Sequence, residues 1–290
     1  MTTKTTTERT ESWREPDWPP PVAPPVLYRY LGAARAKEIL STCKIYFCAP
    51  ASFNDPFDCR IRPCFEGSTR EYKRVAALLA KQRNPRSSRQ VRKGMVKAVS
   101  HKLKANFFED VYRNWETELL DKSGMLCLSE ACDDILMWSH YSEGHAGVCM
   151  TFEYRIGDLP FGHAIPIRYA DTLPDFNFPK IFSDIYGRPI AEQREALVRF
   201  GKFVFLTKAS QWKYEKEWRV IDFPTDSMSR HGLRGFSEHS LTGVILGCRM
   251  REEQRRDIVK LVRSRFSSAT LCESAPSDNQ FGLDIRPLKP

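Results

Sequence analysis

Two glutamates and an arginine recur at every second position within an aromatic-rich segment, residues 212–219. A β-strand places alternate side chains on one face, so a strand here would align the carboxylates of Glu215 and Glu217 with the guanidinium of Arg219. The tryptophan and tyrosine residues around them favour partial burial, where a carboxylate has to be paired or functional. The segment therefore predicts a carboxylate-based active site or, as the alternative, a salt-bridged strand face.

Other polar residues that lie among aromatic ones could shape the same pocket. Asp55 precedes Pro56, a pattern typical of a helix N-cap with proline at the first helical position, which would be a structural role. The functional alternative is that Asn54 and Asp55 form a wall of the pocket. His145 follows the end of an expected helix, and from there it could point into the pocket as a hydrogen-bond donor.

The histidine and cysteine spacings do not favour a metal site. His140 and His145 are five residues apart, about 140° around a helix, so they would not share a face. Three cysteine pairs have four intervening residues, but their apolar surroundings favour buried thiols over zinc ligands. The pairs are Cys43/Cys48, Cys59/Cys64 and Cys127/Cys132.

The elements that must position these residues follow from hydrophobic periodicity and from the turn residues. Strands and helices interleave without a regular βαβ rhythm, and no glycine-rich phosphate-binding motif follows a strand. This pattern indicates an α+β protein with a mixed, largely antiparallel sheet. Strands are expected near 26–31, 44–48, 125–129, 147–153, 203–207, 217–223, 243–247, 269–272 and 281–286. Helices are expected near 33–42, over 69–120 as two or three helices, from 133 to about 144, and over 189–200 and 250–265.

The chain divides into a Thr- and Pro-rich arm, residues 1–25, and a single domain over 26–290 with a basic helical insertion at about 67–120. Between Gly67 and Phe107 there are twelve Lys and Arg residues and one acidic residue, Glu71. This local charge exceeds the +9 of the whole chain, so we expect it to contact nucleic acid or another polyanion unless it is simply a solvated helix face. The basic residues lie within 70–104: Arg70, Lys73, Arg74, Lys81, Arg83, Arg86, Arg89, Arg92, Lys93, Lys97, Lys102 and Lys104.

The composition indicates a cytoplasmic protein. No window approaches the roughly 18 uninterrupted apolar residues of a membrane-spanning helix, and the N-terminus lacks the apolar core of a signal peptide. Nine cysteines are an odd number, and a chain of this length does not need a disulfide framework. The sequence leaves the oligomeric state open.

Five ordered motifs over about residues 27–286 resemble a widespread bacterial domain family of unknown function. They are Leu27-Tyr28-Arg29-Tyr30, Phe53-Asn54-Asp55-Pro56-Phe57-Asp58, Cys127-Leu128-Ser129, Met137-Trp138-Ser139-His140-Tyr141 with His145 and Gly147, and Lys208 with Trp212, Tyr214, Glu215, Glu217, Trp218 and Arg219.

The motif order also resembles, more remotely, the ADP-ribosyltransferase-type fold. In that fold an early strand carries Arg or His, a second carries Ser or Tyr, and a third carries the catalytic Glu, often as Glu-x-Glu. Arg29, Ser129 and Glu217, with Glu215 before it, occupy those places, although many transferases carry Ser-Thr-Ser at the second strand. The resemblance implies that NAD is a substrate and that Glu217, Glu215 and Ser129 are catalytic. It implies NAD-binding roles for Arg29, Asn54, Asp55, His140, Tyr141, His145 and Trp212.

The expected function is therefore that of an ADP-ribosyltransferase-like enzyme, a toxin or phage-defence effector acting on nucleic acid or protein. Arg29, Ser129, His145 and Glu217 should then converge on one cleft. One alternative is a nuclease or nucleic-acid-binding protein. The other is a non-catalytic interaction module whose proline-rich arm docks a partner. A nuclease would bind Mg²⁺ through the carboxylates of Asp55, Asp58, Glu215 and Glu217.

Overall fold

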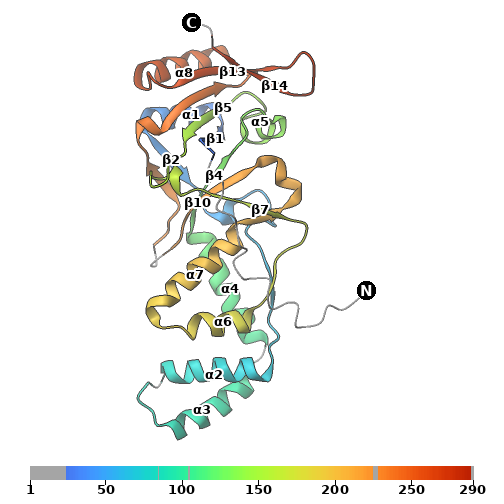
Figure 1. The fold of residues 1–290 in the computed structure, drawn as a ribbon, viewed down its shortest axis with the longest axis vertical. Coiled ribbons are helices and arrows are strands. Elements are labelled where there is room, and N and C mark those ends of the chain that lie inside the picture. The colour runs from blue at the N-terminus through green and yellow to red at the C-terminus, as the bar shows by residue number, and fades with distance from the viewer. Residues whose placement is uncertain (1–23, 84, 104, 225–227, 289–290) are drawn as a thin grey trace.

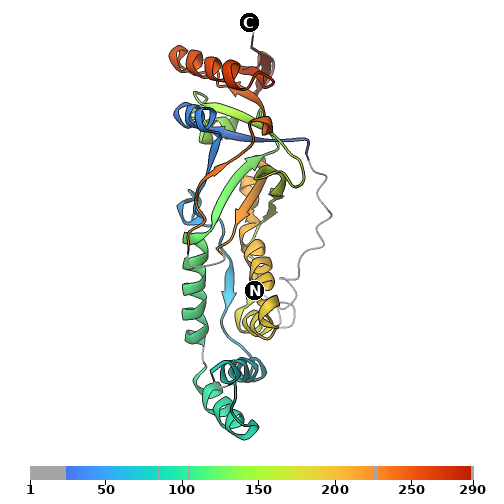
Figure 2. The same ribbon diagram turned by 90° about the vertical axis from the view of Figure 1, so that its left-hand side faces the viewer.

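The computed structural model describes residues 24–83, 85–103, 105–224 and 228–288, so nearly all of the expected N-terminal arm lies outside the described residues. The molecule is elongated, with a twisted sheet in one half and helices in the other (Figures 1 and 2). Among the described residues, no helix is both long enough and apolar enough to cross a membrane.

The sheet has eight strands in the order β14-β13-β12-β5-β1-β4-β10-β6. Among the described strands of this sheet only β12 and β13 pair in parallel, which confirms the expected α+β class with a mixed, mostly antiparallel sheet. The strands of this sheet are β1 (Val26–Leu31), β4 (Gly124–Ser129), β5 (Val148–Glu153), β6 (Ile165–Pro166), β10 (Glu217–Asp222), β12 (Leu241–Leu246), β13 (Thr270–Pro276) and β14 (Leu283–Pro287). The smaller pairs join β2 (Lys44–Phe47) to β11 (Gly232–Gly235), β3 (Arg62–Cys64) to β8 (Asp175–Asn177), and β7 (Arg168–Ala170) to β9 (Thr207–Ala209).

The sheet is incompletely paired at its centre. β1 pairs with β5 along its whole length, and β4 does the same with β10. In contrast, β1 and β4 pair at one position only, Tyr28 with Ser129. Past that position β4 instead forms an isolated bridge from Met125 to Cys48, at the end of β2. The two halves of the sheet therefore separate between β1 and β4.

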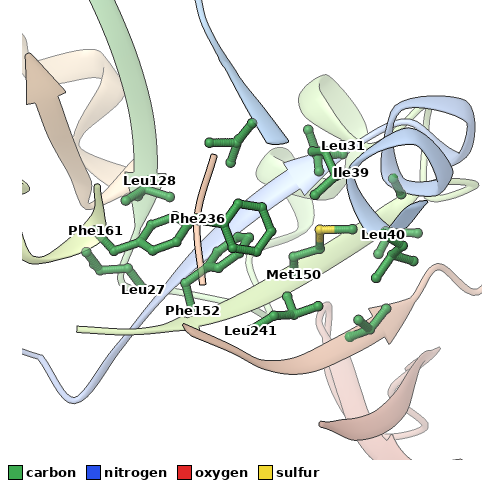
Figure 3. Packing of buried hydrophobic residues seen from close by; sticks show 14 of the residues in the cluster. Leu27, Leu31, Ile39, Leu40, Leu128, Met150, Phe152, Phe161, Phe236 and Leu241 are labelled. Carbon is green, nitrogen blue, oxygen red and sulfur yellow. The ribbon is translucent and has the colours of Figure 1, made fainter. Parts of the chain in front are cut away.

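One face of the sheet packs against α1 (Ala33–Thr42) and α8 (Glu252–Arg265). Alternate residues of the strands point into this core, as expected of a half-buried sheet. Phe152 stacks on Phe161 with ring centroids 4.1 Å apart, and Phe236 packs edge-on against both (Figure 3). These contacts attach the segment after β5 to the centre of the sheet.

The other face carries the short helix α5 (Ile135–Tyr141). It begins as the acidic pair at 133–134 predicts, because Asp134 accepts hydrogen bonds from the backbone N–H groups of Leu136 and Met137. Trp138 is completely buried, packs edge-on against Tyr30 and donates to the carbonyl of Cys132.

The helical half is built from two separate segments of the chain. The two or three helices expected over 69–120 are three, α2 (Thr69–Arg83), α3 (Arg89–Lys102) and α4 (Ala105–Lys122), and α6 (Phe178–Tyr186) and α7 (Ile190–Phe205) pack beside α4. The core between them is aromatic, with Phe108, Phe176 and Phe200 almost fully buried. α2 and α3 form a hairpin at the end of the molecule opposite α8 (Figures 1 and 2).

Two local expectations are wrong, and one helix was not expected. Residues 203–205 continue α7 instead of forming a strand, because Val204 joins Phe200 in the aromatic core at helical spacing. The strand expected at 217–223 is present as β10, but a strand does not extend over the whole of 212–219: residues 210–215 form a 3₁₀ turn that ends at Lys216, whose φ of 44° is left-handed. α6 was missed, although Asn177 caps it by accepting from the N–H of Lys180.

The N-cap of α5 gives the first testable prediction. Replacing Asp134 by Ala removes the acceptor for two backbone N–H groups and should lower the free energy of unfolding by about 1 kcal/mol. Asp133→Ala removes an exposed neighbouring carboxylate and should cost less than about 0.5 kcal/mol. Urea denaturation of both variants is the measurement, and equal losses would contradict the capping role.

Candidate functional site

A cavity of about 540 Å³ opens where β1 and β4 separate. Its walls come from β1, β4, the loop after β2, α5, and the segment from β9 to β10. The cavity is lined by seven residues that the sequence analysis selected for a transferase site: Arg29, Asn54, Ser129, His140, Tyr141, Glu215 and Glu217.

The strand register explains why residues far apart in the sequence meet here. Tyr28 pairs with Ser129, and Ser129 pairs in turn with Glu217 on the next strand. Directly paired residues project from the same face of a sheet, so these three side chains form a row across β1, β4 and β10.

Arg29 spans the gap between the separated strands. Its Nη1 donates to the carbonyl of Cys127 on β4 at 2.5 Å, at a level where the two strands no longer pair. Its buried Nε atom has no hydrogen-bond partner among the described residues. The guanidinium therefore keeps donor capacity at the edge of the cavity.

Five charged side chains form a buried cluster in the cavity wall. Lys208 and Arg219 carry the positive charges, and Arg219 is completely inaccessible to solvent. The Nη2 atom of Arg219 lies 2.6 Å from Oδ2 of Asp58, and the same carboxylate also accepts from its Nη1 at 2.9 Å. Burial of this many charges requires close pairing, which the remaining contacts to Glu215 and Glu217 provide.

Glu217 is fixed as an anion by two cations. Its Oε1 accepts from Nε of Arg219 at 2.7 Å, and its Oε2 accepts from Arg219 and from Nζ of Lys208, both at 2.9 Å. Burial raises the pKa of Glu217, but the charges of Arg219 and Lys208 outweigh burial and hold the pKa well below its usual range.

Glu215 has the opposite electrostatic character. Its Oε1 accepts from the Tyr141 hydroxyl at 2.7 Å, and its Oε2 accepts from Lys208 at 2.5 Å. Burial raises the pKa of Glu215 above its usual range, although Lys208 acts against this rise. Two neighbouring carboxyl groups with pKa values moved in opposite directions are suited to different roles in one reaction.

Ser129 positions the backbone of the Glu215 segment. Its hydroxyl donates to the carbonyl of Glu215 at 2.6 Å and accepts from the N–H of Ala131 at 3.1 Å. The side chain is almost fully buried, so these two hydrogen bonds hold β4 and the 3₁₀ turn together at the base of the cavity.

The rim of the cavity is aromatic. His140 is exposed, and its Nδ1 atom lies 3.2 Å from the hydroxyl of Tyr214. Burial raises the pKa of Tyr214 to about 12. Trp212 does not line the cavity, but its ring lies 5.2 Å from Nζ of Lys208 and packs against His140.

Two predicted residues lie elsewhere. His145 lines a separate groove beside Arg249 and the β13–β14 hairpin, and its ring stacks on Trp138. Its φ of 70° turns the chain towards β5, so the expected convergence holds for Arg29, Ser129 and Glu217 but not for His145. Asp55 does not line the cavity or begin a helix: it caps a turn by accepting from the N–H of Phe57 at 2.9 Å.

Lys208 and Tyr28 line the cavity but were not selected from the sequence, and Asp58 was selected only as a Mg²⁺ ligand of the nuclease alternative. Lys208 and Asp58 belong to the motifs that carry Glu215 and Asn54, so the concentration of charge in those motifs was an available signal. Tyr28 belongs to the same motif as Arg29, but its place beside Ser129 follows only from the strand register.

The carboxylates of the cluster are directed at cations. Asp58, Glu215 and Glu217 approach one another, but Lys208 and Arg219 occupy the space between them. Among the described residues, no group of three or more His, Cys, Asp or Glu side chains is arranged to hold a metal ion. Burial raises the pKa of the Cys48 and Cys127 thiols, so neither is activated as a nucleophile.

The fold and the cavity define an α+β protein with a ligand-sized pocket at a break in its sheet. Residues 137–220 match the model of a family described as a protein of unknown function (DUF2971). This segment contains most of α5 and both glutamates, so the match supports the expected resemblance to a domain family of unknown function. No curated protein and no solved structure matches the chain.

Removal of the central cation should be strongly destabilising. Arg219→Met leaves Asp58 and Glu217 buried without their main partner and should lower the free energy of unfolding by about 3–5 kcal/mol. The matched control is Arg286→Met, which breaks an exposed pair with Asp284 and should change stability little. A loss for Arg219→Met no larger than the loss for Arg286→Met in urea denaturation would contradict the structural role of the cluster.

The cluster should also make stability depend on pH. The pKa of Glu217 is lower in the folded state than in the unfolded state, where it is about 4.3. Its contribution is therefore present above the unfolded-state pKa and is lost as the pH falls towards the folded-state pKa. Urea midpoints at pH 7 and pH 3.5 should show a smaller acid-induced decrease for Glu217→Gln than for the wild type. An equal or larger decrease in the variant would be inconsistent with this assignment.

Proposed function

We propose that the chain is a cytoplasmic, NAD-dependent ADP-ribosyltransferase-like enzyme whose active site is the cavity between β1 and β4. The observation that carries the proposal is that Arg29, Ser129 and Glu217, from three neighbouring strands, line one cavity. An enzyme of this kind could act on nucleic acid or protein, as a toxin or an antiviral-defence effector.

The cavity suits a ligand that has both aromatic rings and negative charge. Its volume falls in the range of sites for small molecules and cofactors, about 300–1,000 Å³. Arg29 and Arg35 line it and can attract the diphosphate of NAD, while Tyr28, Tyr30 and His140 supply ring surfaces. This combination favours a dinucleotide over a purely apolar ligand.

The chemistry would be nucleophilic substitution at the nicotinamide ribose. The bond between the ribose C1′ and the nicotinamide nitrogen breaks, its electron pair leaves with neutral nicotinamide, and the acceptor forms a new bond to C1′. Glu217, held ionised by Arg219 and Lys208, would stabilise the positive charge that develops on the sugar. Glu215, whose pKa burial raises, would take the proton that the acceptor loses.

The nucleic-acid alternative draws support from a different part of the molecule. The basic segment 70–104 carries much of the positive charge of the chain, so nucleic acid is a candidate partner and acceptor. A nuclease mechanism is less well supported, since the carboxylates that would hold Mg²⁺ are paired with Lys208 and Arg219. A non-catalytic interaction module would leave the glutamate pair without a role in the chemistry.

Substitution of the glutamates tests the transferase proposal. Glu217→Gln and Glu215→Gln should each lower the rate of nicotinamide release from NAD by about 10²–10³, the scale expected when one electrostatic stabiliser is lost. Release is measured with labelled NAD and with RNA, DNA and protein as acceptors, and is expressed per folded molecule.

Glu116→Gln is the matched control. Glu116 accepts from the Tyr112 hydroxyl at 2.7 Å and pairs with Arg60, much as Glu215 pairs with Tyr141 and a cation, but it lies outside the cavity. It should keep wild-type turnover. The proposal fails if the wild type releases no nicotinamide with any acceptor, or if the cavity variants retain full turnover.

A further inference from the structure

The α2–α3 hairpin carries positive charge that its own sequence does not neutralise. Glu71 is the one acidic residue between Gly67 and Leu103, and its carboxylate accepts from the backbone N–H of Ser68 at 2.6 Å. Among the hairpin cations whose side chains the structure describes, which leaves out residues 83 and 102, Arg74 alone forms a salt bridge, with Asp184 on α6 at 3.1 Å.

On other helices of the protein, many cations form salt bridges with acidic residues of the same fold. On α4, Arg113 pairs with Glu109 and Lys122 pairs with Glu118, one turn away. Long-range pairs also occur, as between Arg265 on α8 and Glu238. Many cations elsewhere in the molecule are thus paired within the fold, whereas the cations around the hairpin groove, Lys81, Arg89, Arg92 and Lys93, form none of the salt bridges found among the described side chains.

The hairpin also has a groove in which these charges converge. A hollow of about 430 Å³ between α2 and α3 is lined by Lys81, Arg89, Arg92 and Lys93, with Ala77 and Val96 as its apolar lining. Four like charges around one hollow repel each other, so an anion bound between them would remove an unfavourable interaction.

The residue types on the surface of the hairpin indicate which class of partner it can bind. Within its described part, Val91 is the one large apolar residue that is exposed, which gives little surface for insertion into a membrane. No Phe, Tyr or Trp lies in α3 or lines the groove, so the groove offers no aromatic ring on which a nucleic-acid base could stack. The remaining chemistry is attraction between guanidinium or ammonium groups and a repeated phosphate.

We propose that the groove between α2 and α3 binds the phosphodiester backbone of nucleic acid without sequence preference. The hairpin lies at the far end of the molecule from α8, beyond α4, α6 and α7 (Figures 1 and 2). The binding surface is therefore separate from the cavity and is independent of the transferase proposal. In an enzyme that modifies nucleic acid, it would hold the acceptor.

Two charge-matched triple variants of the full chain test this inference. The hairpin variant combines Lys81→Glu, Arg89→Glu and Lys93→Glu. The control combines Arg256→Glu, Lys260→Glu and Arg263→Glu, which reverse three exposed cations on α8. Both variants change the net charge equally, so a difference between them reports the location of the charge. Melting curves verify that each variant is folded, and a Gln series at the hairpin positions replaces the Glu series if that variant unfolds.

Binding is measured by fluorescence anisotropy with labelled duplex DNA and single-stranded RNA of mixed sequence, at several salt concentrations and without NAD. For the wild type, affinity should fall steeply with salt on both probes. Log K falls as log salt concentration rises, and in the hairpin variant this fall should be shallower, its slope smaller in magnitude by about 2–3, since three phosphate contacts are lost. The control variant should keep the wild-type slope. Three results would overturn the inference: an equal loss of affinity in both variants, no binding of the wild type to DNA or to RNA, or tighter binding to anionic lipid vesicles than to nucleic acid.

Discussion

The buried guanidinium of Arg219 holds three separate parts of the chain together. A guanidinium with no access to solvent has to be fully paired, and its partners come from three parts of the chain. Asp58 precedes the helical segment, the carbonyl of Phe205 ends α7, and Glu217 begins β10. One side chain thereby joins the sheet to both segments of the helical half.

The same constraint shapes the cavity. Arg219 and Lys208 draw Asp58 and the two glutamates into one wall, while the strands above them separate after Tyr28 and Ser129. Arg29 crosses the opening and is bonded to a backbone carbonyl that a fully paired β1 strand would have used. The cavity wall therefore consists of charged side chains that hold one another in place. At the opening, Arg29 has a donor, Nε, without a hydrogen-bond partner among the described residues.

Much of this arrangement could be predicted from the sequence, because it depends on local pattern. The aromatic and aliphatic residues at 26–31 predicted strand β1, and the acidic cap at 134 predicted the start of α5. The charge-rich motifs predicted residues that line the cavity between β1 and β4. The failures come from tertiary contacts. His145 follows the expected helix, but a left-handed backbone turns it away, and the aromatic core of the helical half extends α7 through residues that resemble a strand. Neither effect is visible in residue spacing.

We propose that the cavity between β1 and β4 binds NAD, and a crystal structure of the protein with NAD or a non-hydrolysable analogue is the direct test. The dinucleotide should lie between the two strands, with its diphosphate near Arg29 and its nicotinamide ribose facing Glu217 and Glu215. A dinucleotide bound elsewhere, such as the groove beside His145, or crystals that take up no ligand at saturating concentration, would contradict it.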